Sequence, residues 1–363
     1  MWCTYDQRLT NYRGSVVQKE REVYSPKFGG QMQRFANFPR WGIFVGTSAV
    51  VAFAGAFGLV RATNAQLDKV DRVAEVTQVL SPASNTVENY LLVGSDSRAS
   101  IDENDPDYAT MGSEGEVGGQ RSDSMIVLRY DKQQKSVSLV SIPRDLYAAI
   151  GVGEKKDRIN VAYQEGAPSL VRTLQRALDI PIHHYMEIDF GGFRGMVDAI
   201  GGVRICFEVP SRDQQTGFVV RRPGCPLLNG TKALAYARSR YFQQQIDGEW
   251  REDPTRDIGR SARQRDFITE LMKQSASYVT DHPFSVEKIM NAFSGSLKVD
   301  SNLSLVDMAR KMRPAASGDI ESYTLPTEND MVGDKSVLQL TEEAPTFLAY
   351  FAGTGPAPQT ATE

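Results

Sequence analysis

Two short segments of the chain each carry one carboxylate and one guanidinium among serines. Gly94–Arg98 reads Gly-Ser-Asp-Ser-Arg, and Arg121–Ser124 reads Arg-Ser-Asp-Ser. Two carboxylates brought together from such segments can hold Mg²⁺, which prefers a few carboxylates and completes its coordination with the phosphate oxygens of a substrate. For either segment alone, ordinary turn chemistry is the simpler explanation of Ser-Asp-Ser. A metal site at Asp96 and Asp123 therefore depends on the fold bringing the two segments together.

Arginines recur where two further elements are expected to end. Arg144 follows an apolar run, and Arg238 and Arg240 lie in the segment Ala-Tyr-Ala-Arg-Ser-Arg-Tyr. If the chain leaves its helix at about Ala237, these last two arginines point the same way, because side chains of an extended chain repeat with period two. A guanidinium binds two phosphate oxygens at once through its planar fork. The spacing thus favours a phosphate-binding site.

A helix is predicted over residues 254–275, because Asp253 can cap it and Pro254 suits its first position. It carries a basic stripe of residues that share one face at this spacing, namely Arg256, Arg260 and Arg263. The alternative is a solvated helix face whose arginines pair locally with Asp257 and Asp266. Taken alone, the stripe is explained more simply by the solvated face.

Short apolar runs predict the strands that must position these residues. We expect strands over 89–93, 125–130, 136–142 and 184–190, of which the second and third form an antiparallel hairpin. Apolar residues at helical spacing predict an amphipathic helix over 169–178. Strands that alternate with helices in this way indicate an α/β domain built on a mixed sheet.

A segment near the N-terminus has the properties of a membrane span. Residues 41–60 contain no charged side chain, and a helix of about 20 residues crosses the core of a bilayer. Basic residues are concentrated before this segment, so the positive-inside rule leaves the N-terminus in the cytoplasm. We expect a disordered tail over 1–40, a transmembrane helix over 41–60, a stalk over 61–85, a folded domain over 86–350 and a loose tail over 351–363. The protein is then a single-pass plasma-membrane protein with its folded domain on the outer face.

Charge and cysteine content limit the function further. The 363 residues carry a formal net charge of −4, with a sequence pI of about 5.6, so no general basic field attracts nucleic acid. Any anion site must therefore be local. Cys206 and Cys225 would be exported together into an oxidising compartment, where we expect a disulfide between them. Two buried free thiols are the alternative.

In their order along the chain, seven segments resemble the LytR-CpsA-Psr (LCP) family of cell-envelope transferases. They read LLVGSDSR, RSDSMIVLRYD, VSLVSIPRDLY, DRINVAYQEGAPSLV, HHYMEIDFGGFRGMVDAIGGV, LLNGTKALAYARSRY and DIGRSARQRDFI. The resemblance implies an LCP-type domain whose mixed, largely antiparallel sheet is flanked by helices. It also implies transfer of a glycan phosphate from a polyprenyl-pyrophosphate carrier to peptidoglycan, with release of polyprenyl phosphate. The cysteines resemble those of actinobacterial members, which favours an arabinogalactan-type glycan.

The resemblance also implies roles for individual residues. Asp96 and Asp123 would hold Mg²⁺, with Mn²⁺ as the alternative. The pyrophosphate would be bound by Arg98, Arg121, Arg144, Arg238, Arg240, Arg260, Arg263 and Gln264. Arg144 and Arg260 would also act in catalysis, and Asp257 would orient or deprotonate the acceptor hydroxyl. Helix capping or pairing with Arg260 explains Asp257 equally well. Apolar residues of 170–200 would line a tunnel for the polyprenyl tail, or form ordinary core.

The residues themselves agree with this chemistry, because phosphoryl transfer depends on positioning and charge stabilisation and needs no histidine or serine nucleophile. Two other functions stay open. A pyrophosphatase would use water in place of the sugar hydroxyl, and a membrane-tethered lipid-binding or regulatory protein would show no turnover. A DNA-binding regulator is disfavoured, because the folded domain would lie across the membrane from the chromosome.

Overall fold

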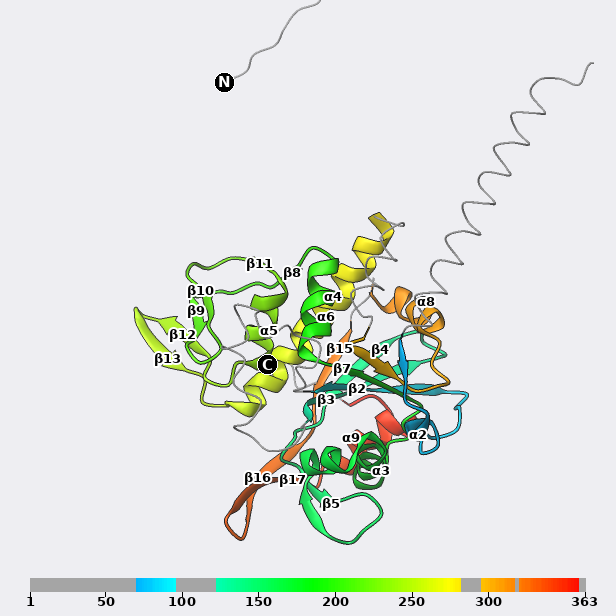
Figure 1. Cartoon of the computed structure of the whole chain (residues 1–363). Helices are drawn as coiled ribbons and strands as arrows, with labels where there is room; N and C mark the ends of the chain where they lie inside the picture. Colours follow the sequence, from blue (N-terminus) through cyan, green and yellow to red (C-terminus); the bar gives the residue numbers. More distant parts are fainter. Residues whose placement is uncertain (1–69, 96–121, 282–294, 317–319, 359–363) are drawn as a thin grey trace, which may run out of the picture. The chain divides into compact units, whose positions relative to one another are not determined.

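The computed structural model describes residues 70–95, 122–281, 295–316 and 320–358. The predicted cytoplasmic tail and transmembrane helix lie outside these ranges, and the predicted stalk and C-terminal tail lie partly outside them. Within these ranges, no helix is both long enough and apolar enough to cross a bilayer. The described residues form the folded domain (Figure 1).

A seven-stranded mixed sheet forms the centre of the domain, in the order β1-β14-β7-β2-β3-β4-β15. The strands are β1 (Asp71–Arg72), β14 (Leu297–Val299), β7 (His184–Ile188), β2 (Val87–Ser95), β3 (Ser122–Asp131), β4 (Val137–Ser141) and β15 (Glu321–Thr324). The pairs β14–β7, β2–β3 and β3–β4 are antiparallel, whereas β1–β14, β2–β7 and β4–β15 are parallel. The two kinds of pairing are equally frequent, so the sheet is mixed without being mostly antiparallel. The strands predicted over 89–93, 125–130 and 136–142 are confirmed. The strand predicted over 184–190 is present but ends at Ile188, because Asp189 caps the helix that begins at Phe190.

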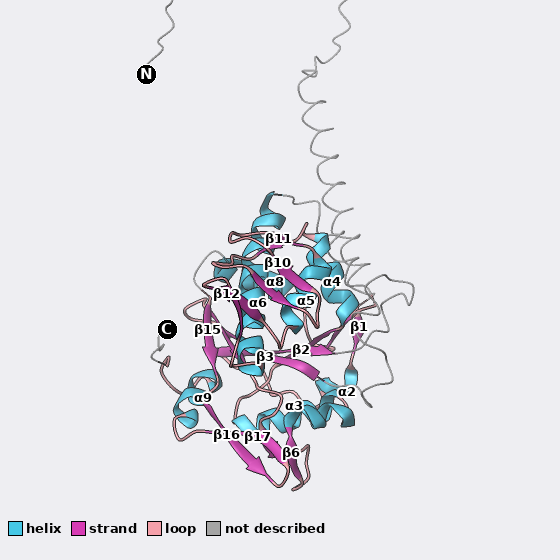
Figure 2. Ribbon diagram, turned by 90° about the vertical axis from the view of Figure 1, so that its left-hand side faces the viewer, coloured by secondary structure: helices cyan, strands magenta, loops and turns pink. Residues whose placement is uncertain are grey.

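Helices cover both faces of this sheet (Figure 2). On one face, Leu91 and Val127 pack with α3 (Ala167–Leu178), α9 (Ala344–Ala352) and the short α2 (Ala74–Thr77). On the other face, Tyr90 and Ile126 pack with α6 (Asp257–Asp281) and α8 (Leu305–Ala316). Neighbouring residues of one strand thus enter different cores, because side chains alternate across a sheet. The predicted amphipathic helix over 169–178 is confirmed as α3, and its apolar residues belong to the first core.

A smaller unit lies beside the sheet and carries its own apolar core. It contains α4 (Phe190–Ala199), α5 (Gly230–Arg238) and a four-stranded sheet in the order β10-β9-β12-β13. Its strands are β8 (Val203–Arg204), β9 (Ser211–Asp213), β10 (Phe218–Val220), β11 (Leu227–Leu228), β12 (Gln243–Ile246) and β13 (Glu249–Glu252), with β8 and β11 paired separately. Cys206 and Cys225 form a disulfide in this unit, with their Cα atoms 3.9 Å apart.

Two hairpins lie together at one end of the domain (Figure 1). The first joins β5 (Tyr147–Ala149) to β6 (Lys156–Arg158), with a 3₁₀ helix (Ile159–Glu165) following, and the second joins β16 (Thr327–Val332) to β17 (Lys335–Leu340). Arg158 donates to the backbone carbonyl of Ser336, and Lys335 pairs with Asp157 at 2.8 Å. These contacts connect two segments that are far apart in the sequence.

The domain begins earlier than the predicted boundary at residue 86. β1 pairs with β14 at the edge of the central sheet, and Val76 is fully buried in the first core. Arg72 donates from Nη1 to the carbonyl oxygens of Asp300 and Leu303, at 3.0 and 2.6 Å. Residues 70–85, which were predicted to be part of the stalk, therefore belong to the folded domain.

Candidate active site

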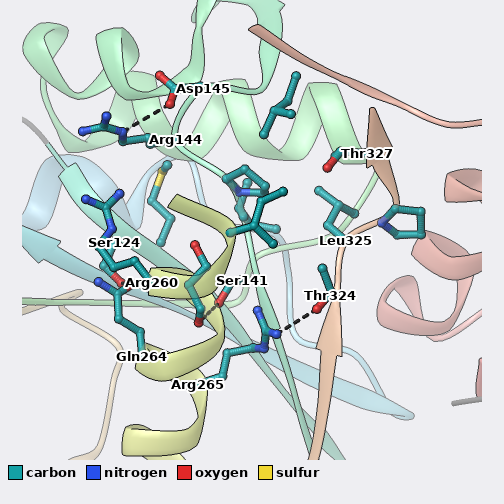
Figure 3. Close-up of a pocket in the computed structure, with 17 residues that line it drawn as sticks. Ser124, Ser141, Arg144, Asp145, Arg260, Gln264, Arg265, Thr324, Leu325 and Thr327 are labelled. Carbon is teal, nitrogen blue, oxygen red and sulfur yellow. Dashed lines mark hydrogen bonds and ion pairs between the residues drawn. The ribbon is translucent and has the colours of Figure 1, made fainter. Parts of the chain in front are cut away.

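A cavity of about 230 Å³ opens where several elements of the central sheet end (Figure 3). Its walls come from the start of β3, the end of β4 with the loop that follows, the first turns of α6, the end of β15 and the base of the second hairpin. The polar residues among those walls are Ser124, Ser141, Arg144, Asp145, Arg260, Ser261, Gln264, Arg265, Thr324 and Thr327. Among the described residues, three guanidinium groups and one carboxylate therefore line a single cavity.

Three residues that the sequence singles out meet in this cavity, namely Arg144, Arg260 and Gln264. Arg144 contacts Asp145, with 3.3 Å between its Nε and Oδ2, and the other oxygen of that carboxylate lies 3.5 Å from Nε of Arg158. Asp145 thus lies between two arginines, one of which lines the cavity. Arg260 reaches the cavity from the first turns of α6 and is 4% exposed.

Gln264 ties three elements of the site together. Its Oε1 accepts a hydrogen bond from the hydroxyl of Ser124 at 2.9 Å, and its Nε2 donates to the carbonyl of Ala237 at 2.9 Å. Ser124 follows Asp123 on β3, and Ala237 precedes Arg238 at the end of α5. The amide therefore positions two of the predicted functional segments as well as lining the cavity.

Arg238 and Arg240 do not share the extended geometry that the sequence suggested. α5 continues through Arg238 and ends at Ser239, which adopts an extended backbone, so only one of the two arginines has left the helix. The guanidinium of Arg238 lies 4.8 Å from the centre of the Phe190 ring. Both arginines are partly buried, and neither is among the residues that line the described cavity.

The segment between these two arginines is fixed by a buried carboxylate that sequence reasoning missed. Oδ2 of Asp213 accepts from the hydroxyl of Ser239 at 2.6 Å and from the backbone N–H of Tyr241 at 3.0 Å. Its Oδ1 accepts from the backbone N–H groups of Gln215 and Thr216, at 2.8 and 3.2 Å. Asp213 is fully buried and lies on β9 of the smaller sheet. No local signal marks it, since Asp213–Gly217 reads as an ordinary turn.

Arg263 holds the same segment from the opposite side. It donates from Nη2 to the carbonyl of Ser239 at 2.9 Å and pairs through Nη1 with Asp253 at 2.6 Å. Burial alone would raise the pKa of Asp253, but hydrogen bonds from Thr255 and Arg263 lower that pKa below its ordinary value. Arg263 is 8% exposed and does not line the cavity, so its guanidinium acts as a structural tie.

The predicted basic stripe is therefore not a single surface. α6 begins at Asp257, and Arg256 precedes it with φ of 41° and pairs with Glu252 at 3.5 Å. The loop before the helix packs so closely on its first turn that a Cβ at residue 259 would clash with the carboxylate of Asp253. Gly259 permits this approach. Of the three stripe arginines, Arg260 alone lines the cavity, within the part of the chain that the structure describes.

The remaining predicted site residues cannot be placed. Asp96, Arg98 and Arg121 lie outside the described residues, and the side chains of Asp123 and Asp257 are not described, although their backbones belong to β3 and α6. Among the described residues, no three metal-binding side chains form a cluster. The antiparallel register nevertheless sets Ser95, which precedes Asp96, opposite Ser122, which precedes Asp123.

Comparison with known proteins assigns the chain to a family. The LytR_cpsA_psr family matches residues 56–347. A probable cell wall biosynthesis protein, LcpB from Corynebacterium glutamicum, is 31% identical over 321 residues, which cover 87% of this chain and 72% of that protein. TagU from Enterococcus faecalis, named a polyisoprenyl-teichoic acid–peptidoglycan teichoic acid transferase, is 34% identical over 55% of this chain and 60% of that protein.

Solved structures share the fold. A LytR-Csp2A-Psr enzyme from Actinomyces oris superposes with a TM-score of 0.58 at 24% identity, over 78% of this chain and 96% of that one. TagV from Bacillus subtilis superposes with a TM-score of 0.56 at 22% identity, over 76% of this chain and all of that one. At these identities the structural likeness concerns the fold alone. Together with the sequence matches, it establishes that this chain belongs to the LytR-CpsA-Psr family.

Proposed function

We propose that this protein transfers a glycan phosphate from a polyprenyl-pyrophosphate carrier to peptidoglycan and releases polyprenyl phosphate. The observation that carries the proposal is the cavity in which Arg144, Arg260 and Gln264 meet at the ends of the central strands. Guanidinium forks in a partly enclosed site suit phosphate oxygens better than point charges do. The names of TagU and LcpB, which concern transfer to peptidoglycan and cell wall biosynthesis, support the same reaction class.

In the proposed reaction, an acceptor hydroxyl oxygen attacks the phosphorus that carries the glycan. The bond from that phosphorus to the bridging oxygen breaks, and the electron pair leaves with polyprenyl phosphate. Arg144 and Arg260 would stabilise the negative charge that develops on the transferred and departing phosphates, which is the main contribution a protein makes to phosphoryl transfer. We assign the hydroxyl proton to Asp257, which lies at the first position of α6.

We assign a Mg²⁺ ion, or Mn²⁺ as the alternative, to Asp96 and Asp123. The register between β2 and β3 supports this, because the residues that precede the two aspartates are paired across the strands. Two carboxylates completed by substrate phosphate oxygens match the coordination that Mg²⁺ prefers. The ion would supply Lewis-acid stabilisation of the phosphate charge.

We also propose that residues 41–60 anchor the protein in the plasma membrane and that the folded domain lies on the outer face. The disulfide between Cys206 and Cys225 supports export, because such bonds persist mainly in oxidising compartments. The same disulfide favours an arabinogalactan-type glycan, through the resemblance to actinobacterial members of the family.

The test uses the full-length chain in detergent with a labelled polyprenyl-pyrophosphate glycan and peptidoglycan. We expect Mg²⁺-dependent formation of labelled peptidoglycan together with equal amounts of polyprenyl phosphate. Release of the glycan phosphate into solution, with no labelled peptidoglycan, would instead establish a pyrophosphatase. The absence of turnover with tight retention of the carrier lipid would favour a lipid-binding role and contradict the proposed transfer.

A further inference from the structure

Arg265 lies next to Gln264 on α6 and lines the same cavity from the side of β15 (Figure 3). It is 7% exposed. Its Nε donates to the hydroxyl of Ser322 at 3.0 Å, and its Nη2 donates to the hydroxyl of Thr324 at 2.7 Å. Both partners are side chains of β15, so the guanidinium is fixed in place by an element of the central sheet.

Both of these partners are neutral. Burial lowers the pKa of Arg265, and the charge of the neighbouring Asp266 counteracts this only in part. An arginine nevertheless keeps its charge in a protein. A buried charge is normally paired with an opposite charge, yet no carboxylate among the described residues forms an ion pair with Arg265.

Two other buried arginines of the domain show the usual arrangement. Arg129 is 4% exposed and contacts Asp131 at 2.9 Å. Arg263 is 8% exposed and contacts Asp253 at 2.6 Å. Neither of these two lines the described cavity. Arg265 therefore differs from both in having neutral partners and in facing the space that a substrate would enter.

We infer that Arg265 marks a second anion subsite, on the β15 wall of the cavity, that takes a carboxylate or phosphate group of a substrate. The inference rests on the proposed function, in which both substrates carry such groups. Nε and Nη2 are engaged by β15, and no hydrogen bond joins Nη1 to the described residues, so Nη1 is the atom that would donate to the ligand. In Figure 3, Arg144 and Arg265 lie well apart among the residues that line the cavity.

The decisive variant is Arg265→Gln in the full-length chain, because glutamine can still donate to a β15 hydroxyl but carries no charge. Transfer is measured with peptidoglycan strands whose carboxylates are free or have been amidated. If the anion belongs to the acceptor, the KM for free strands rises about tenfold or more, and the KM for amidated strands does not change. If the anion belongs to the carrier, the KM for the carrier rises by a similar factor with either acceptor.

Unchanged KM values for both substrates in Arg265→Gln would overturn the second subsite. If wild-type protein transfers nothing, the proposed function fails, and calorimetry with inorganic phosphate then tests the subsite separately. Weaker phosphate binding in Arg265→Gln than in wild type would support the subsite, and equal binding would overturn it.

A second variant covers the case in which Arg265→Gln does not fold. Thr324→Asp places a carboxylate beside Arg265, so it should raise the Tm and weaken phosphate binding by occupying the subsite from within the chain. A variant that folds and binds phosphate as tightly as wild type would overturn the inference. Thr324→Asn is the matched control, because it introduces a side chain of nearly the same size as aspartate without the charge, and it should bind phosphate more tightly than Thr324→Asp does.

Discussion

The two ends of strand β2 carry polar clusters with opposite designs. Near its first residues, Glu88 accepts from Lys311 at 2.8 Å and contacts His184 at 3.0 Å, and the other nitrogen of that histidine lies 3.2 Å from Asp300. Near its last residue lies the cavity, which three arginines and one carboxylate line among the residues that the structure describes. The first cluster balances its charges within the chain, whereas arginines outnumber carboxylates among the described residues that line the cavity.

This difference separates charge that stabilises the fold from charge that lines a cavity. In the first cluster, burial raises the pKa of Glu88, but the hydrogen bonds from His184 and Lys311 outweigh that effect and lower the pKa to about 2. Burial lowers the pKa of His184, and the contacts with Asp300 and Glu88 outweigh it and raise the pKa to about 8. Such mutual compensation is what stabilises buried ions.

The largest expected effect is on turnover at the cavity. Arg144→Gln should lower kcat/KM by about 10² to 10³, because it removes a fixed charge from the developing phosphate charge. The Tm should change less than the activity, since Arg144 and Asp145 are both partly exposed and solvent screens their contact. Transfer assays and thermal unfolding on the same preparation measure both quantities. Arg144→Lys should retain part of the activity, and wild-type activity in either variant would contradict the role of this arginine.

A smaller effect on turnover is expected at Asp213, the buried carboxylate that positions the segment from Arg238 to Arg240. Asp213→Asn removes the charge that accepts from Ser239 and Tyr241, so the segment from Arg238 to Arg240 should lose its fixed position. We expect about a tenfold loss of kcat/KM and a loss of about 1–3 kcal/mol of unfolding free energy. Arg263→Lys, which keeps a charge but loses the fork, should act in the same direction. Full activity in a destabilised Asp213→Asn protein would show that Asp213 is structural only.

The cluster around Glu88 and His184 should make the stability of the fold depend on pH, without an effect on the cavity. The folded-state pKa of His184 is about 8, above the ordinary 6.5, so its contribution is fully present below pH 6.5 and is lost as pH rises through 8. The loss should be about 2 kcal/mol. The stabilisation from Glu88 has the opposite pH dependence. It is fully present above pH 4.5 and is lost only as pH falls through 2. Urea unfolding at pH 6 and pH 9 measures the loss, and His184→Gln should show much less of it.

The smallest effect is expected at the tie between the two hairpins. Lys335 pairs with Asp157 in contact with solvent, and its side chain is 55% exposed. Lys335→Ala should therefore change the free energy of unfolding by less than about 1 kcal/mol. A loss of several kcal/mol, measured by urea unfolding, would show that an exposed pair can match the buried cluster at Glu88.

Local sequence patterns were sufficient to predict the strands and helices whose burial follows directly from the spacing of their apolar residues. The apolar runs of β3 and β4 and the helical period of α3 predicted those elements, because burial on a sheet or helix face follows sequence spacing. The site was predicted in part, since Arg144, Arg260 and Gln264 do line one cavity.

The rest depends on contacts that no local pattern encodes. The prediction that Arg256 shares a helix face with Arg260 and Arg263 was wrong, because Arg256 has a left-handed backbone and lies outside α6. Arg263 and Arg265, two residues apart, differ in role because one meets Asp253 and the other meets Ser322 and Thr324, which lie 57 and 59 residues further along the chain. The edge strand β1 likewise depends on pairing with β14, more than 220 residues away.

That edge strand has a mechanical consequence. Because β1 runs parallel to β14, a pull on the chain from its N-terminal side would load their backbone hydrogen bonds in shear, together with the two bonds from Arg72 to the loop after β14. Tension would thus pass directly into the central sheet at Val70, with no slack segment between residue 70 and the fold to absorb it. A pull on residue 70 would therefore be resisted by the central sheet itself, without first straightening a flexible leader.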